Sequence, residues 1–199
     1  MKLTVAGAGP GNPALITQEV LQEIKNTDIV VGFERIADDL KTIRPDIIKI
    51  KKVNDILPIT EQNNDVVILA SGDPCFFGIT EFLKTKGLKI DKVLTGISSM
   101  QYLMSKLQKQ WQYVKFYSFH GRVPDFSELK KEKVFFILTD KTNTPDFISQ
   151  KLKKIGIRGS IYVGYNLSYE DELIETYSIG DSIPIKSFLN TVLVESSIL

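Results

Sequence analysis

The hydrophobic pattern of the chain centres on a short apolar run at residues 66–70. This run is rich in β-branched residues and too short for a typical helix, so it predicts a strand that is buried on both faces. It stops at the turn-forming residues Ser71-Gly72-Asp73-Pro74. Open α/β sheets bind ligands beyond the carboxyl ends of their strands. The turn is therefore either a ligand site or an ordinary strand-to-helix turn.

Short apolar runs and helical patterns alternate through the first half of the chain. A strand at residues 2–6, an amphipathic helix at 15–24 and a strand at 29–31 form a β-α-β opening. Further strands are predicted at 46–53 and 92–94, and further helices at 36–40, 80–86 and 100–107. The alternation predicts a mostly parallel, doubly wound sheet with flanking helices.

The pattern changes near residue 110, where helices become scarce. Strands are predicted at 113–119, 133–138, 160–163, 172–179 and 191–194, with one helix from about residue 143 to 155. Consecutive strands without helices between them favour hairpins and a mixed sheet. We therefore predict two α/β domains, residues 1–110 with the parallel sheet and residues 111–199 with the mixed sheet.

Three strands of the first domain are predicted to end in loops of small residues. These loops are Gly7-Ala8-Gly9-Pro10-Gly11-Asn12-Pro13, the turn at residues 71–78, and Thr95-Gly96-Ile97-Ser98-Ser99. In a parallel sheet such loops can converge on one edge. The first loop is not a dinucleotide fingerprint, because position 12 is asparagine and Pro10 lacks an amide hydrogen. No P-loop motif occurs in the sequence.

Composition and charge limit the classes of protein to which the chain can belong. Of 199 residues, 43% are hydrophobic and 25% are charged, and the net charge is +1, which is typical of a soluble globular protein. Such a charge gives no general attraction to nucleic acid, and no apolar run is long enough to cross a membrane. The single cysteine, Cys75, fits a reducing compartment. We therefore predict a cytoplasmic protein that binds neither nucleic acid nor membrane.

Side chains for acid–base catalysis are few. His120 is the only histidine, which excludes a multi-histidine metal site, and no metal is predicted. Cys75 is either a nucleophile paired with His120 across the two domains or a small residue that packs in its loop. His120 either holds a ligand or has a purely structural role. Arg35 and Arg122 either pair with carboxylates of a substrate or are exposed, unpaired arginines. Open backbone loops with few acid–base groups suit methyl transfer from a sulfonium donor, because alignment supplies much of the acceleration.

The three loops and their order resemble the tetrapyrrole methylase family. Gly7 to Pro13 is similar to the family's first-strand glycine-proline loop, and Ser71-Gly72-Asp73-Pro74 through Phe76-Phe77-Gly78 is similar to its S-G-D-P-x-F-x-G segment. Gly96-Ile97-Ser98-Ser99 with Gln101 resembles the third loop. Three more segments resemble the branch that methylates C5 of the corrin precursor: Val31-Gly32 with Arg35, Phe119-His120-Gly121-Arg122, and Asn166-Leu167-Ser168-Tyr169-Glu170-Asp171-Glu172.

This resemblance implies an S-adenosylmethionine-dependent C-methyltransferase that acts on C5 of cobalt-precorrin-7 in cobalamin biosynthesis and releases S-adenosylhomocysteine. It implies the tetrapyrrole methylase fold, with the donor in a cleft completed by the second domain, and a homodimer. The substrate is a small, polyanionic tetrapyrrole. Because the chain stops at Leu199, we expect C5 methylation alone, with C15 methylation and decarboxylation left to a separate protein as functional partner.

Matching the family's motifs residue by residue gives the expected site. The predicted cofactor-binding residues are Gly9, Pro10, Gly11, Gly72, Asp73, Phe76, Gly78, Ser98, Ser99, Leu138, Thr139, Asn166 and Leu167. The predicted substrate-binding residues are Pro10, Arg35, His120 and Arg122. Asp73 is expected to position the donor rather than act as a base, and no side chain is assigned a certain catalytic role.

Two positions depart from the family pattern. Cys75 stands where the family often has glycine, which counts against a catalytic cysteine. Glu170 stands where proline is common, which leaves the shape of that loop open. Two other functions also stay open: a methylase of the same fold that acts on another tetrapyrrole, on RNA or on a protein, and a non-catalytic nucleotide-binding module.

Overall fold

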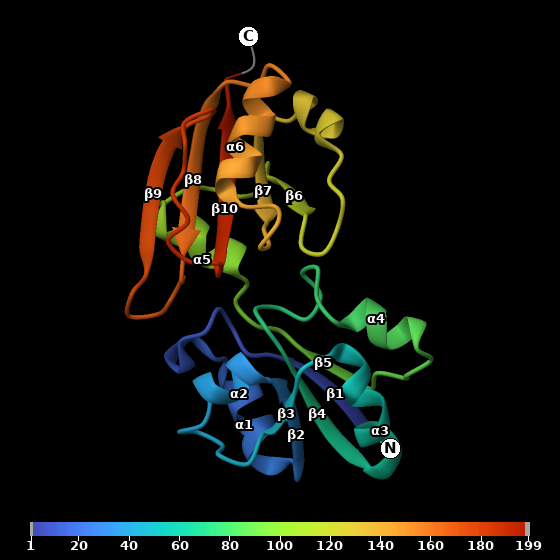
Figure 1. Cartoon of the computed structure of the whole chain (residues 1–199). Coiled ribbons are helices and arrows are strands. Elements are labelled where there is room, and N and C mark those ends of the chain that lie inside the picture. Colours follow the sequence, from blue (N-terminus) through green and yellow to red (C-terminus); the bar gives the residue numbers. More distant parts are fainter. Residues whose placement is uncertain (1, 198–199) are drawn as a thin grey trace. The chain divides into compact units, whose positions relative to one another are not determined.

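The structure is a computed structural model that describes residues 2–197 (Figure 1). Contacts between residues divide the chain into two compact units, residues 1–99 and 100–199. The sequence pattern places the boundary near residue 110, beyond helix α5 (Ser99–Lys106), and that boundary stays a prediction.

The first unit is a five-stranded parallel sheet with the strand order β3-β2-β4-β1-β5. The strands are β1 (Lys2–Gly7), β2 (Ile29–Phe33), β3 (Ile48–Ile50), β4 (Asp65–Ala70) and β5 (Lys92–Leu94). The α-helices are α1 (Gln18–Asn26), α2 (Glu34–Asp39), α3 (Ile56–Gln62) and α4 (Thr80–Thr85), with 3-10 turns at Pro13–Leu15 and Val53–Asp55. The predicted doubly wound parallel sheet is confirmed.

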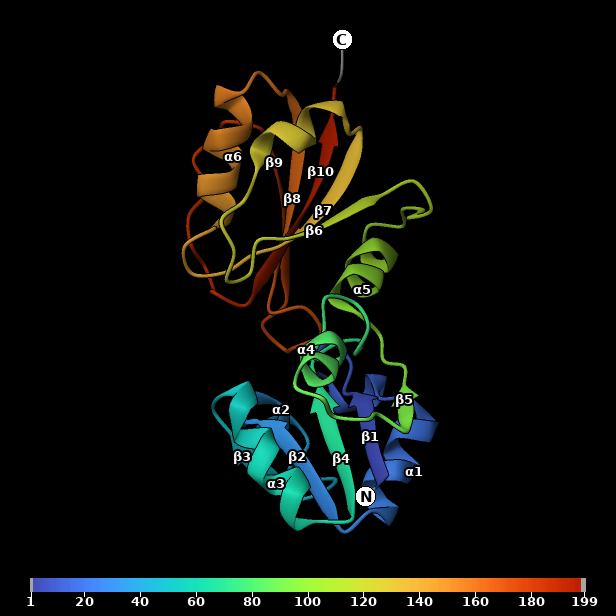
Figure 2. The ribbon, with the colours of Figure 1, turned by 90° about the vertical axis from the view of Figure 1, so that its right-hand side faces the viewer.

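The central apolar run is strand β4, which lies in the middle of this sheet and is buried on both faces. Val67 and Leu69 belong to the core that α1 and α2 cover. Val66 and Ile68 belong to the opposite core, which includes Ile56 of α3 and buried side chains of α4. Helices therefore lie on both sides of the sheet (Figure 2). Since neither face of β4 meets water, every side chain from residue 66 to residue 70 is apolar.

The segment after β2 differs from the prediction. A strand was expected over residues 46–53, but β3 covers only Ile48–Ile50. The physical reason is that Asp55 accepts hydrogen bonds from the amides of Lys51 and Lys52, at 3.1 Å and 2.8 Å, so these amides are not available to a strand. The chain then turns into α3, a helix that the short apolar pattern did not reveal.

The second unit is a mixed sheet with the strand order β6-β7-β10-β8-β9. The strands are β6 (Lys115–Ser118), β7 (Val134–Leu138), β8 (Gly159–Tyr165), β9 (Leu173–Ser178) and β10 (Asn190–Ser196), and α6 spans Pro145–Lys154 with a 3-10 helix at Phe126–Lys131. β6 and β7 are parallel, whereas β10 is antiparallel to both β7 and β8, and β8 is antiparallel to β9. The predicted mixed sheet is confirmed.

Both faces of this second sheet are covered. Phe135 and Ile137 of β7 share a core with Ile148 and Leu152 of α6. Phe136, between them, points to the opposite face and is fully buried as well. Helix α5 lies on that side of the sheet (Figures 1 and 2). The central strands β7 and β10 therefore carry apolar runs, like β4 of the first unit.

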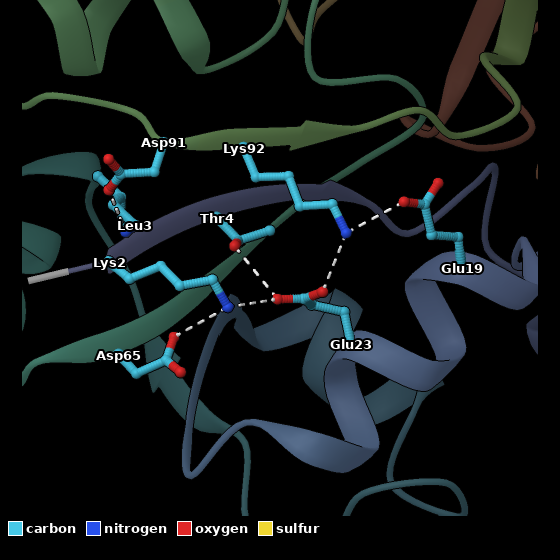
Figure 3. A network of polar contacts seen from close by, with 8 residues as sticks. All are labelled: Lys2, Leu3, Thr4, Glu19, Glu23, Asp65, Asp91 and Lys92. Atoms are coloured by element: carbon cyan, nitrogen blue, oxygen red, sulfur yellow. Dashed lines mark hydrogen bonds and ion pairs between the residues drawn. The ribbon is translucent and has the colours of Figure 1, made fainter.

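A polar network ties α1 to the sheet of the first unit (Figure 3). Glu23 of α1 lies at its centre and accepts hydrogen bonds from Lys2 at 3.3 Å, Thr4 at 3.3 Å and Lys92 at 3.2 Å. Lys2 also lies 3.8 Å from Asp65. Burial by itself would raise the pKa of Glu23, but the hydrogen bonds from Lys92 and Lys2 outweigh it and hold the pKa below its ordinary value of 4.5.

We predict that Glu23→Gln lowers the free energy of unfolding by about 1–2 kcal/mol at pH 7, because the charged acceptor of three donors is lost. The pKa of Glu23 is lower in the folded protein than in the unfolded chain. The carboxylate therefore stabilises the fold above pH 4.5 and loses this effect as the pH falls through the folded-state pKa. Urea unfolding at a series of pH values measures this difference. A gap of constant size from pH 7 down to pH 3, or an equal effect of Glu61→Gln on the exposed side of α3, contradicts the prediction.

Candidate functional site

Two of the predicted small-residue loops are joined directly beyond β1 and β4. The amide of Ala8 donates to the carbonyl of Ala70 at 2.8 Å. The amide of Gly72 donates to Gly9 at 2.8 Å, and the amide of Gly9 donates to Gly72 at 3.2 Å, which forms a short antiparallel bridge. These loops therefore converge on one edge of the sheet, as predicted.

The third loop meets the other two through backbone contacts that only glycine permits. A Cβ atom on Gly96 would lie 2.2 Å from the carbonyl oxygen of Gly72. A Cβ atom on Gly7 would lie 2.5 Å from the amide nitrogen of Gly96. Real Cβ atoms do not approach backbone atoms so closely, so the three loops can touch only because positions 7 and 96 lack side chains, while Gly72 supplies the carbonyl oxygen and has a positive φ. The edge is thus made of backbone groups.

The carboxylate of Asp73 joins the second loop to the third through hydrogen bonds. One carboxylate oxygen, Oδ2, accepts hydrogen bonds from the Thr95 hydroxyl at 2.6 Å and from the Gly96 amide at 3.2 Å. The other, Oδ1, accepts from the Cys75 amide at 2.8 Å within its own turn. The sequence indicated a positioning residue but did not show that Asp73 positions protein loops. Both of its oxygens serve that purpose here.

The rest of the turn at residues 71–78 is equally constrained. The Thr80 hydroxyl donates to the carbonyl of Pro74 at 3.0 Å, and the Phe76 amide donates to Asp73 at 3.2 Å. Gly78 closes the turn, because a Cβ atom there would lie 2.2 Å from the oxygen of Pro74. Ser98 is buried, and its Cα would lie 3.4 Å from a Cβ on Gly72. Five predicted cofactor-binding residues, Gly72, Asp73, Phe76, Gly78 and Ser98, thus share this edge with Gly9.

Pro10, Gly11 and Ser99 complete the predicted set in this unit. Pro10 and Gly11 continue the first loop and are buried, while Ser99 is partly buried at the first position of α5. Arg35, a predicted substrate-binding residue, lies at the same edge because α2 begins directly after β2, the neighbour of β4. Its guanidinium donates to the hydroxyl of Ser71 at 2.6 Å and pairs with Asp39 at 3.2 Å. The structure therefore brings Arg35 to the glycine loops.

In the second unit, the predicted residues after β7 and β8 gather around residues that the sequence did not single out. The Thr139 hydroxyl lies 2.6 Å from the carbonyl oxygen of Asn190 and 2.7 Å from its side-chain oxygen. The Asn190 amide group donates to the carbonyl of Ser187 at 2.7 Å, and the Ser187 hydroxyl donates to Asn166 at 2.6 Å. This chain of hydrogen bonds links Thr139 to Asn166.

Leu138 and Leu167 frame the same edge. Leu138 is the last residue of β7. Leu167 is buried against Gly164, where a Cβ atom would lie 2.8 Å from the Leu167 side chain. Asn190 carries no motif and precedes an apolar strand, so its role depends on a strand pairing that spans more than fifty residues. No local signal in the sequence identifies it.

The loop with His120 and Arg122 follows β6 and is held by two polar side chains of the next loop. His120 Nδ1 lies 3.1 Å from the carbonyl oxygen of Thr139, which only accepts hydrogen bonds, so Nδ1 carries the proton. Asp140 accepts from the amide of Gly121 at 2.8 Å, and Asn143 donates to the carbonyl of Phe119 at 2.8 Å. His120 and Arg122 are both exposed, and within residues 2–197 Arg122 forms no ion pair.

Asp140 stays charged in this arrangement. Burial by itself would raise the pKa of Asp140, but hydrogen bonds from the amides of Asn143, Gly121 and Thr142 outweigh it and lower the pKa below its ordinary value. The sequence placed Asn143 at the opening of a helix, whereas Thr144 caps α6 by accepting from the Phe147 amide at 3.2 Å. Asn143 and Asp140 instead fix the loop that carries His120.

Left-handed backbone conformations mark the same loops. Among the described residues, four that are not glycine have a positive φ: Phe77, Gln108, Asn166 and Ser168. Phe77 lies in the turn after β4, and Asn166 and Ser168 lie in the loop after β8. Such conformations are costly outside glycine and persist where the surroundings impose them, often at binding sites. Three of these four residues thus lie in two of the loops for which the sequence predicts a binding site.

Other features of the described chain can be stated briefly. Within residues 2–197, no group of three histidine, cysteine, aspartate or glutamate side chains could hold a metal ion. No helix in that range is long and apolar enough to cross a membrane. Cys75 is exposed and lies in a different unit from His120.

Comparisons with known proteins agree with this arrangement. A family model described as Tetrapyrrole (Corrin/Porphyrin) Methylases matches residues 2–182. The chain is 30% identical over 192 aligned residues to the probable cobalt-precorrin-7 C(5)-methyltransferase of Methanocaldococcus jannaschii, with 89% of each chain covered. It is 29% identical over 181 residues to the cobalt-precorrin-7 C(5)-methyltransferase of Salmonella typhimurium, which covers 86% of this chain and 88% of the relative.

Two solved structures show the same fold. The precorrin-6Y methylase of Archaeoglobus fulgidus has a TM-score of 0.76 at 22% identity, with 99% of both chains covered. The uroporphyrin-III C-methyltransferase of Thermus thermophilus, in complex with S-adenosylhomocysteine, has a TM-score of 0.77 at 19% identity, with 98% of this chain and 92% of that chain covered. The fold expected from the sequence motifs is confirmed.

We predict that Gly96→Ala lowers the free energy of unfolding by about 3 kcal/mol or prevents folding, because its Cβ has no room beside the oxygen of Gly72. The control is Gly87→Ala after α4, where φ is positive, unlike at Gly96, but nothing lies within 4 Å of a Cβ. That variant is expected to lose about 1 kcal/mol from backbone strain alone. Urea unfolding compares the two variants. Equal losses would show that the contact between the loops is not tight.

Proposed function

Because the chain belongs to the tetrapyrrole (corrin/porphyrin) methylase family, and is therefore an S-adenosylmethionine-dependent C-methyltransferase, we propose that it methylates C5 of cobalt-precorrin-7 in cobalamin biosynthesis. The observation that carries this proposal is the similarity to two proteins named for that reaction, over 86–89% of this chain at 29–30% identity. The family match spans residues 2–182, a range that contains all of the predicted site residues.

The loops fit the donor chemically. S-adenosylmethionine has an amino acid end and a nucleoside end, which require hydrogen-bonding groups and close backbone approach. The first unit offers an edge built of glycine backbone, where Gly72 has a φ of +66°. The second unit offers the left-handed backbone of Asn166 and the buried side chain of Leu167. These features support the proposal that Gly9, Pro10, Gly11, Gly72, Asp73, Phe76, Gly78, Ser98 and Ser99, with Leu138, Thr139, Asn166 and Leu167, bind the donor.

Transfer is proposed to depend on alignment. When bound, S-adenosylmethionine supplies a methyl group that the sulfonium charge has already activated, so that an electron-rich carbon can attack it in line. The rigid loops hold the two reactants at a fixed distance, and Asp73 contributes by fixing two of those loops to each other. Cys75 has no part in this scheme, because direct transfer needs no covalent enzyme intermediate.

The substrate is proposed to bind through exposed cations. Its peripheral carboxylates would pair with Arg122 and His120, which extend from a loop that Asp140 and Asn143 hold rigid. Arg35 beside Ser71, together with Pro10, completes the proposed substrate contacts. A homodimer, a cytoplasmic location and a separate C15-methylating decarboxylase as partner remain predictions.

The direct test is incubation of the protein with S-adenosylmethionine and cobalt-precorrin-7, followed by mass spectrometry of the macrocycle. We expect one added methyl group and one S-adenosylhomocysteine per product. Cys75→Ala is expected to retain turnover, and its complete loss in a folded variant would contradict direct transfer. The uroporphyrin-III-type substrate of the Thermus relative serves as the control. Methylation of that control but not of cobalt-precorrin-7 would assign the chain to another tetrapyrrole.

A further inference from the structure

Phe77 is a bulky residue in a backbone conformation that favours glycine. Its φ is +52°, in the left-handed region, where the side chain of most residues crowds the following carbonyl. Glycine and asparagine adopt this conformation readily, and phenylalanine rarely does. A phenylalanine at this position therefore needs a reason.

The neighbours of Phe77 impose this conformation without help from its ring. The turn is closed by the hydrogen bond from the Cys75 amide to Asp73 at 2.8 Å and by the bond from Thr80 to Pro74 at 3.0 Å. Gly78 allows the backbone to pass close to the Pro74 oxygen. Asparagine at position 77 would fit the same turn with less strain.

Burial in the core does not explain why position 77 carries an aromatic side chain either. The side chain of Phe77 is 41% exposed, and its ring meets Phe76 edge to face with 5.1 Å between the centroids. A strained backbone and a large exposed apolar surface are both unfavourable in the free protein. Features that weaken a fold at a loop beside a binding site are typical of residues kept for function.

We propose that Phe77 is a further substrate-binding residue, whose ring lies against the flat face of the tetrapyrrole macrocycle. The inference rests on the proposed function, because it needs a substrate with a broad apolar face and charged edges. The turn at residues 71–78 brings an aromatic ring and a cation together. Phe77 lies in this turn, and Arg35 donates a hydrogen bond to Ser71 at its start. Stacking on the face orients the ring system, while the guanidinium recognises a carboxylate at its rim.

The test compares Phe77→Asn with the wild-type protein. We expect the KM for cobalt-precorrin-7 to rise about tenfold, the range that loss of one aromatic stacking partner produces. The Kd of S-adenosylhomocysteine is expected to match the wild type, and the urea midpoint is expected to be no lower, because asparagine fits the turn with less strain. Phe77→Tyr keeps the ring and should recover most of the affinity, whereas Phe77→Leu should not.

Gln108→Gly is the control for backbone strain. Gln108 is exposed and also has a positive φ, of +54°, but it follows α5 and belongs to no predicted binding loop. Its replacement should leave the KM for the macrocycle unchanged. An equal rise in KM for Gln108→Gly and Phe77→Asn would overturn the inference, because relief of strain alone would then be the cause.

Separate measurements of macrocycle binding and of turnover distinguish a failure of this inference from a failure of the proposed function. The Kd of cobalt-precorrin-7 is measured by absorbance titration with S-adenosylhomocysteine present. A wild-type protein that binds the macrocycle without methylating it contradicts the proposed reaction, and weaker binding by Phe77→Asn still supports the role of Phe77. Equal Kd values for wild type and Phe77→Asn overturn that role even where methylation occurs. A matching loss of S-adenosylhomocysteine affinity in Phe77→Asn overturns it too, because the ring would then serve the donor or the turn.

Discussion

Backbone contact among Gly7, Gly72 and Gly96 is the constraint on which the first unit depends. The three loops approach so closely that a Cβ atom on Gly7 or Gly96 would overlap a neighbouring carbonyl or amide. This contact holds only if β4, β1 and β5 are adjacent and parallel, and the buried apolar core on both faces of β4 secures that order. The polar network around Glu23 attaches α1 to the same strands from the other end. The fold thereby presents backbone groups, rather than side chains, at its carboxyl edge.

The loops of the second unit are also fixed to one another, but by side chains rather than by contact between backbones. Its loops are joined by side-chain hydrogen bonds, with Asn190 and Ser187 between Thr139 and Asn166. Asp140 and Asn143 fix the backbone around His120 in the same way. These polar cross-links fix the backbone of the loop, while the side chains of His120 and Arg122 stay exposed. The proposed methyl transfer depends on alignment of the two reactants, which rigid loops would favour.

Local patterns were sufficient to predict the sheets and much of the candidate site. A buried run such as Val66–Ala70 has a pattern that only a central strand explains, and the glycine loops carry motifs that resemble one family. The pattern failed where distant residues decide the outcome. Asp55 ends β3 early through its bonds to two amides, and Asn190 and Asn143 gain their roles from contacts across long stretches of sequence. The left-handed conformation of Phe77 is imposed by the hydrogen bonds that close its turn, and phenylalanine at this position does not indicate it.

Hydrogen–deuterium exchange with and without S-adenosylhomocysteine tests whether the glycine loops of the first unit and the loops after β7 and β8 bind the methyl donor. We expect slower exchange on ligand binding in the segments at residues 8–13, 71–78 and 95–99, and in those at 138–143 and 166–172. The amides of α1 and of the 3-10 helix at Phe126–Lys131 should exchange at unchanged rates. Protection confined to other surfaces at saturating ligand, with the glycine loops unaffected, would show that these loops do not bind the donor.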